Sequence, residues 1–109
     1  MLLLITTKAD DEILKRVSLD LDGYVKVVVD VEKEVLAAGG LKHVEGEQLL
    51  LKAGSKQQNL WGAGLDLETG EIDFDSMINI RPNQGNSSRE ILSEAIRKQV
   101  EGIIRSLLK

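Results

Sequence analysis

The sequence predicts an α+β domain in which a five-stranded, largely antiparallel sheet packs against three helices, with the C-terminal helix packed on one sheet face. Three segments carry apolar residues at helical spacing, and five others are valine-rich or alternating runs that end near glycine, proline or Asp-Gly signals. The 109 residues are 42% hydrophobic and 29% charged, which suits one folded core and excludes a disordered chain. We therefore expect a single globular domain over residues 1–109.

The first half of the chain is expected to form three strands and two helices. The first five residues form an apolar strand, and a helix over residues 9–19 follows a capping-box pattern that begins at Thr7. The valine-rich segment 24–31 is apolar on both faces, which places it near the centre of the sheet. Residues 35–38 return beside it as a hairpin arm, and a short helix covers about 44–53.

Two alternating segments predict a second hairpin over residues 59–81. With Thr69-Gly70 at the centre of the turn, Leu65 faces Phe74, and most large apolar side chains share one face. A slip of one residue would instead pair Leu65 with Asp73 and bury carboxylates, at several kcal/mol for each unpaired charge on rough figures. We therefore expect the register that is centred on Thr69-Gly70.

The outer face of this hairpin is expected to be open. It carries Gly62 and Gly64 beside Leu60 and Met77, so bare backbone is available to a second copy of the chain. This surface is the predicted seam if the protein is a homo-oligomer. A weaker hypothesis is a cation site formed by the acidic residues of the same face, Asp66, Asp73 and Asp75. The ordinary alternation of a strand with one solvated face explains these acidic residues equally well.

The longest predicted helix lies at the C-terminus. A broad apolar stripe runs over residues 91–108, with charged residues outside it. Its start is open between two N-cap residues, because Ser87 forms a capping-box pattern with Glu90 and Ser93 is a second candidate.

Composition limits the classes of partner. The chain has a net charge of −4 and only 3% aromatic residues, which argues against nucleic acid as a ligand. The positive charge is confined to the end: residues 1–80 contain 8 Lys+Arg and 15 Asp+Glu, and residues 81–109 contain 6 and 3. The first apolar run is too short for a signal peptide or a membrane span, and the chain has no cysteine. We expect a cytoplasmic protein with no membrane partner.

Several sequence blocks together resemble a family of short prokaryotic proteins described only as a domain of unknown function. The most specific blocks are Leu60-Trp61-Gly62 and Asn79-Ile80-Arg81-Pro82. The resemblance covers nearly the whole chain and implies neither an activity nor catalytic residues. Relatives tend to carry an acidic residue and a proline near Ser93, which favours the later start of the last helix.

The strongest candidate site is a polar segment that follows the second hairpin. No acidic residue lies between Asp75 and Glu90, while the segment offers arginines, amides and hydroxyls as hydrogen-bond donors for an anion. The predicted anion-binding residues are Asn79, Arg81, Gln84, Asn86 and Arg89. On the opposing interpretation, these groups satisfy the backbone of a long loop. The leading hypothesis is a binding or accessory module that holds an anionic group of a small molecule or a protein partner.

His43 is the basis of a competing hypothesis. It is the only histidine, and with Glu45 and Asp30 it would form the centre of a metal-assisted hydrolase or act as a general base. A simple ion pair with Glu47, four residues later, explains the same pattern. No spacing indicates a resident metal or cofactor, so none is expected.

Overall fold

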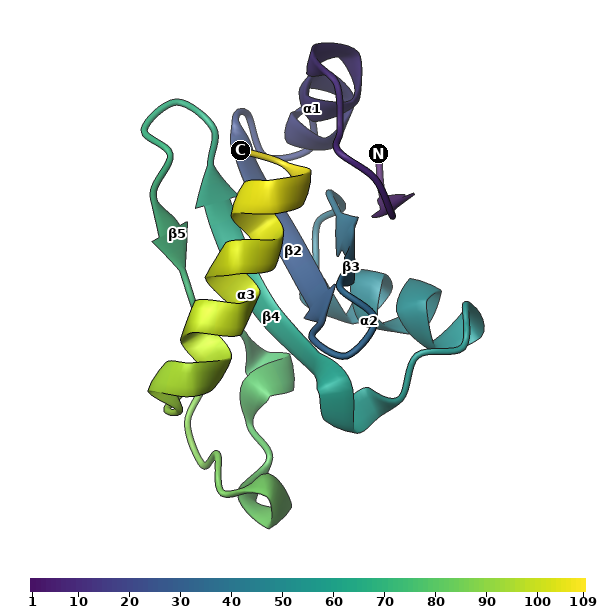
Figure 1. The fold of residues 1–109 in the computed structure, drawn as a ribbon. Coiled ribbons are helices and arrows are strands. Elements are labelled where there is room, and N and C mark those ends of the chain that lie inside the picture. Colours follow the sequence, from purple (N-terminus) through teal and green to yellow (C-terminus); the bar gives the residue numbers. More distant parts are fainter.

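Five antiparallel strands form one sheet in the order β1-β3-β2-β4-β5 (Figure 1). The structure is a computed structural model that describes all residues 1–109. The strands are β1 (Leu3–Ile5), β2 (Tyr24–Asp30), β3 (Val35–Ala38), β4 (Leu60–Asp66) and β5 (Ile72–Asp73). The predicted α+β class and the central position of the valine-rich strand are confirmed.

Three α-helices cover the two faces of this sheet. They are α1 (Asp11–Ser18), α2 (His43–Lys52) and α3 (Glu94–Leu107). Figure 1 shows α3 lying across β2 and β4, with α2 behind the sheet. No helix has the length and apolar character needed to cross a membrane.

The valines of β2 contribute to cores on both faces of the sheet. Val25, Val27 and Val29 join a cluster of 17 buried residues that includes α1 and α3 side chains. Val28 points to the other face and packs with Leu50 of α2 in a cluster of four. The double burial explains why this strand is continuously apolar.

The helix starts are determined by side-chain caps. Ser93 accepts a hydrogen bond from the Ile96 N–H at 3.2 Å, so α3 begins at the later of the two predicted positions. Asp10 caps α1 by accepting from the Ile13 N–H at 2.9 Å, so the predicted cap at Thr7 is wrong.

The register of the second hairpin differs from the prediction by two residues. Leu65 pairs with Ile72 rather than with Phe74. The Asp66 carboxylate accepts from the N–H groups of Glu68 and Thr69 and holds a turn longer than two residues. Because the shift is even, Ile72 and Phe74 keep the predicted face and pack against the main core.

The second arm of this hairpin leaves β4 after Asp73. Two short 3-10 helices follow, η2 (Met77–Asn79) and η3 (Pro82–Gln84), and Ile78 packs with the smaller core instead of the predicted face. The Ser76 N–H donates to the Arg89 carbonyl at 3.0 Å, which joins the arm to the segment before α3. Another 3-10 helix, η1 (Gln57–Asn59), precedes β4.

Candidate functional site

The guanidinium group of Arg81 is buried in the protein. It donates to the carbonyl of Gln57 at 2.6 Å and to that of Leu60, and it stacks 4.0 Å from the centre of the Trp61 ring. Only Nε lacks a partner, and this atom is sealed from solvent. Arg81 therefore ties η3 to the start of β4, and its donors are not available to a ligand.

The two buried asparagines, like Arg81, use their side chains to hydrogen-bond the backbone of the chain. The Asn79 side chain accepts from the Gly62 N–H at 2.8 Å and donates to the Gly62 carbonyl at 3.0 Å, as a neighbouring strand would. The Asn86 amide donates to three carbonyls, and its oxygen accepts from the Leu92 N–H. The expectation of free donors is wrong for Arg81, Asn79 and Asn86, because the chain's own backbone uses them.

The remaining two predicted anion-binding residues are exposed. Gln84 donates to the Gln58 carbonyl at 3.1 Å and accepts from Arg81. Arg89 donates from Nε to Asp75 at 3.0 Å, and the terminal nitrogens of its guanidinium have no partner in the chain. Of the five predicted residues, only Arg89 reaches a pocket.

The predicted triad of His43, Glu45 and Asp30 does not form a metal site. Asp30 is buried and accepts from the Glu32 N–H and from the Ser55 hydroxyl, at 2.9 and 2.6 Å. Glu45 accepts from two backbone N–H groups at the start of α2, which lowers the pKa of its carboxyl. No three His, Cys, Asp or Glu side chains in the chain are grouped to hold a metal ion, so this triad prediction is wrong. Both carboxylates stabilise turns instead.

A pocket of about 500 Å³ lies where the start of α2 meets β2, β5 and the segment before α3. Its lining combines charged, aromatic and apolar side chains: Tyr24, Lys26, Lys42, His43, Val44, Asp73, Asp75, Ser76, Met77, Ile78, Arg89 and Glu90. A second hollow of about 400 Å³ beside α3 contains one lysine and one acid and no histidine. The first pocket therefore holds the concentration of titratable groups that marks a candidate site.

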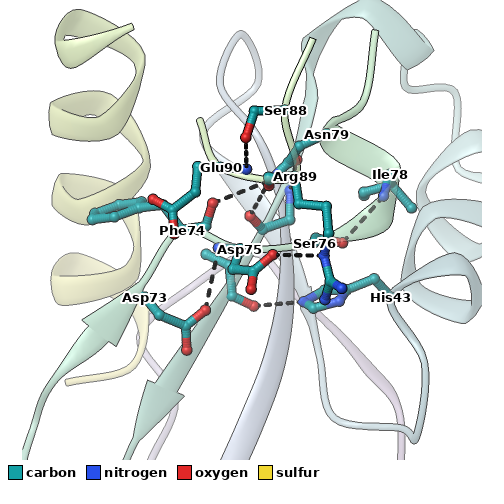
Figure 2. A network of polar contacts seen from close by, with 12 residues as sticks. His43, Asp73, Phe74, Asp75, Ser76, Ile78, Asn79, Ser88, Arg89 and Glu90 are labelled. Atoms are coloured by element: carbon teal, nitrogen blue, oxygen red, sulfur yellow. Dashed lines mark hydrogen bonds and ion pairs between the residues drawn. The ribbon is translucent and has the colours of Figure 1, made fainter. Parts of the chain in front are cut away.

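His43 contributes a neutral imidazole to this pocket. Its Nε2 lies 2.7 Å from the Ala63 carbonyl, which fixes the neutral ring with the proton on Nε2 (Figure 2). Burial lowers the pKa of His43 below its usual value of 6.5, and the charge of Lys26 acts in the same direction. The predicted ion pair with Glu47 does not form, because the imidazole is bonded to β4 instead. Nδ1 has no partner in the chain and is not sealed from solvent.

The charged groups of the pocket differ in whether they have partners. Asp73 accepts from the Tyr24 hydroxyl at 2.6 Å, Asp75 pairs with Arg89, and Glu90 pairs with Arg97 at 2.7 Å. Figure 2 shows Asp75, Arg89 and His43 coming together from separate segments. In contrast, Lys26 and Lys42 belong to no ion pair. The unpartnered polar groups at this site are therefore mainly donors.

The hydrogen bond between Tyr24 and Asp73 predicts an unusual titration. Tyr24 is the only tyrosine, and burial, reinforced by Asp73, raises its pKa far above the ordinary value of 10.0. Because the folded-state pKa is raised, we expect stability to fall as pH rises above the unfolded value of about 10. Absorbance titration of the folded protein should show no phenolate at about pH 11. Asp73→Asn should move the pKa back toward 10, and an ordinary titration in the unmodified chain would contradict this environment.

The glycines on the outer face of the hairpin make room for the chain's own side chains. A Cβ on Gly64 would lie 1.7 Å from the Tyr24 hydroxyl, and one on Gly62 would lie 2.5 Å from the Ser76 Cβ. Leu60 is fully buried against α2, while Met77 is 65% exposed. The predicted seam for a second copy is thus covered from within the molecule, and the open-backbone interpretation is wrong.

Comparison with known proteins gives a family without an assigned activity. The model of a family described as protein of unknown function, DUF5674, matches residues 3–107. The chain belongs to the DUF5674 family. This confirms the resemblance seen in the sequence. No curated protein and no solved structure shows significant similarity to the chain.

Sequence reasoning missed most of the pocket of this DUF5674 domain. Lys26 lies in a valine-rich strand and Lys42 precedes a helix, and neither has a motif around it. The one available signal was the pair of glycines, because a strand interrupted by Gly62 and Gly64 indicates that other atoms approach its backbone closely. The approaching atoms come from Ser76, Tyr24 and Asp73.

Proposed function

We propose that this DUF5674 domain binds a small molecule through an anionic group in the pocket between α2, β2 and β5. The observation that carries the proposal is the presence of Lys26 and Lys42 without ion-pair partners in a pocket where each acidic side chain already accepts a side-chain hydrogen bond. Asp73 accepts from the Tyr24 hydroxyl, and the other two acidic residues pair with arginines. Ammonium groups without partners gain charge-assisted hydrogen bonds from an incoming anion without breaking existing ones. We also propose a cytoplasmic location, because a small chain without cysteine suits a reducing compartment.

Arg89 supplies the third cationic contact of the proposed site. Its Nε donates to Asp75, while the terminal nitrogens make no hydrogen bond within the chain. A guanidinium in this arrangement can bind two anionic oxygens side by side. The role predicted for Arg89 is therefore retained, while the partners predicted beside it are replaced by the two lysines.

Lys26→Met is expected to weaken anion binding about tenfold or more, because it removes a charge-assisted hydrogen bond and keeps the length of the side chain. The probe is inorganic phosphate, titrated at constant ionic strength while amide chemical shifts are followed. Lys8→Met is the matched control, since Lys8 is exposed and does not line the pocket. Phosphate that binds Lys26→Met as well as the unmodified chain contradicts the proposal, and so does the absence of saturable shifts around the pocket with both phosphate and a carboxylate probe, glycolate.

A further inference from the structure

One acceptor without a partner in the chain, Nδ1 of His43, lies among the unpartnered donors of the proposed binding pocket. The proton of the neutral His43 ring is directed to the Ala63 carbonyl, so the accessible Nδ1 presents a lone pair. Around it, the cationic side chains of Lys26, Lys42 and Arg89 present only protons. The pocket therefore has a mixed pattern that an anion with only acceptor oxygens satisfies incompletely.

We propose that the ligand's anionic group is accompanied by an O–H donor, which bonds to Nδ1 of His43 while its anionic oxygens face the lysines and Arg89. Hydrogen phosphate and a 2-hydroxycarboxylate both have this pattern of charge and donor. The inference deepens the proposed function and depends on it. It assigns His43 the role of a specificity-determining residue.

An O–H donor is required because the lone pair of His43 Nδ1 needs a proton from the ligand to form a hydrogen bond. A fully deprotonated oxyanion would direct an oxygen lone pair at the Nδ1 lone pair, or leave Nδ1 without a partner at the ligand. An O–H group converts this contact into a hydrogen bond. The charged groups that face His43 are Lys26 of β2, Asp73 of β5 and Asp75 beyond it, and their effects on the ring oppose one another. Burial decides in favour of the neutral form, which can accept this bond.

Two pairs of probes of similar size test this proposal at pH 7.5 and constant ionic strength. Inorganic phosphate is compared with sulfate, and glycolate with acetate, because only the first member of each pair carries an O–H donor. We expect the donor-bearing probe to bind about tenfold more tightly in at least one pair, as one well-formed hydrogen bond allows. The pair that shows the difference identifies the ligand as a phosphate or as a hydroxy acid.

His43→Gln separates the role of the acceptor from that of the fold. The glutamine amide can still donate to the Ala63 carbonyl, but no acceptor remains at the position of Nδ1. We expect the variant to lose the preference within each pair and to keep the affinity for sulfate and acetate. In the unmodified chain, the sole histidine gives a direct readout: the ¹⁵N signal of Nδ1 should respond to a preferred probe and not to its partner.

The outcomes distinguish the two proposals. Equal affinities within both pairs, together with saturable binding, overturn the assignment of His43 and leave the anion-binding function intact. A preference that persists in His43→Gln, or an Nδ1 signal that responds equally to both members of the pair that shows the preference, also overturns it. No saturable binding by any of the four probes overturns the proposed function and this inference together.

Discussion

Asn79→Ala is expected to lower the free energy of unfolding by about 3 kcal/mol or more, a large part of the stability of a domain of this size. The Asn79 side chain serves the N–H and C=O of Gly62, and it also donates to the carbonyls of Phe74 and Arg89. Truncation leaves the N–H and C=O of Gly62 without these partners in a fully buried position, while the carbonyls of Phe74 and Arg89 keep hydrogen bonds from backbone N–H groups. The loss of stability is large because each buried backbone group left without a hydrogen bond costs free energy, in addition to the contact that is lost.

Urea unfolding measures this effect. Asn83→Ala is the matched control, because Asn83 is exposed in η3 and makes no hydrogen bond through its side chain, so its truncation should change stability by less than about 0.5 kcal/mol. Similar midpoints for both variants would show that Asn79 does not replace a strand partner of β4.

Gly62→Ala is expected to destabilise the domain by about 1–3 kcal/mol through overpacking. The added methyl would lie 2.5 Å from the Cβ of Ser76, an atom attached directly to the backbone, and 3.1 Å from Ile78. Side-chain rotation cannot relieve the contact with Ser76, because its Cβ is fixed to the backbone. The segment that holds Ser76 must move, and this segment also forms one wall of the pocket.

Gly102→Ala provides the opposite expectation with the same chemical change. Gly102 lies within α3 and a Cβ there would meet no atom within 4 Å, so the alanine should stabilise the helix by about 0.5–1 kcal/mol. Thermal unfolding of the two variants should therefore shift in opposite directions. A neutral Gly62→Ala would indicate that the hairpin arm is not closely packed on β4.

The sequence predicts those parts of the fold in which the burial of a residue follows from the pattern of its neighbours along the chain. The valines of β2 and the apolar stripe of α3 are local patterns, and burial follows from them directly. The face of the hairpin arm was also predictable, because alternation survives a shift of two residues. The register was not, since it depends on how the Asp66 carboxylate closes the turn.

The candidate site was less accessible for the same physical reason. A donor-rich loop does not reveal whether its donors are occupied, because the partners of Arg81 lie 24 and 21 residues away at Gln57 and Leu60. The metal-site hypothesis failed similarly: Glu45 is occupied by its own helix start, and Asp30 by a turn and a distant serine. Of the residues named in these two hypotheses, only Arg89 and His43, whose side chains keep atoms without partners, line the pocket.

By itself, the amino-acid sequence determined an acidic, cysteine-free α+β domain, the central strand and the long terminal helix, because hydrophobic periodicity is a property of neighbouring residues. Tertiary structure alone decided which polar groups form hydrogen bonds within the protein and which have no partner in the chain. It joins Tyr24 to Asp73 across 49 positions and leaves Lys26 and Lys42 without ion pairs. A hydrogen bond depends on distance and direction, and these exist only once remote segments have packed together.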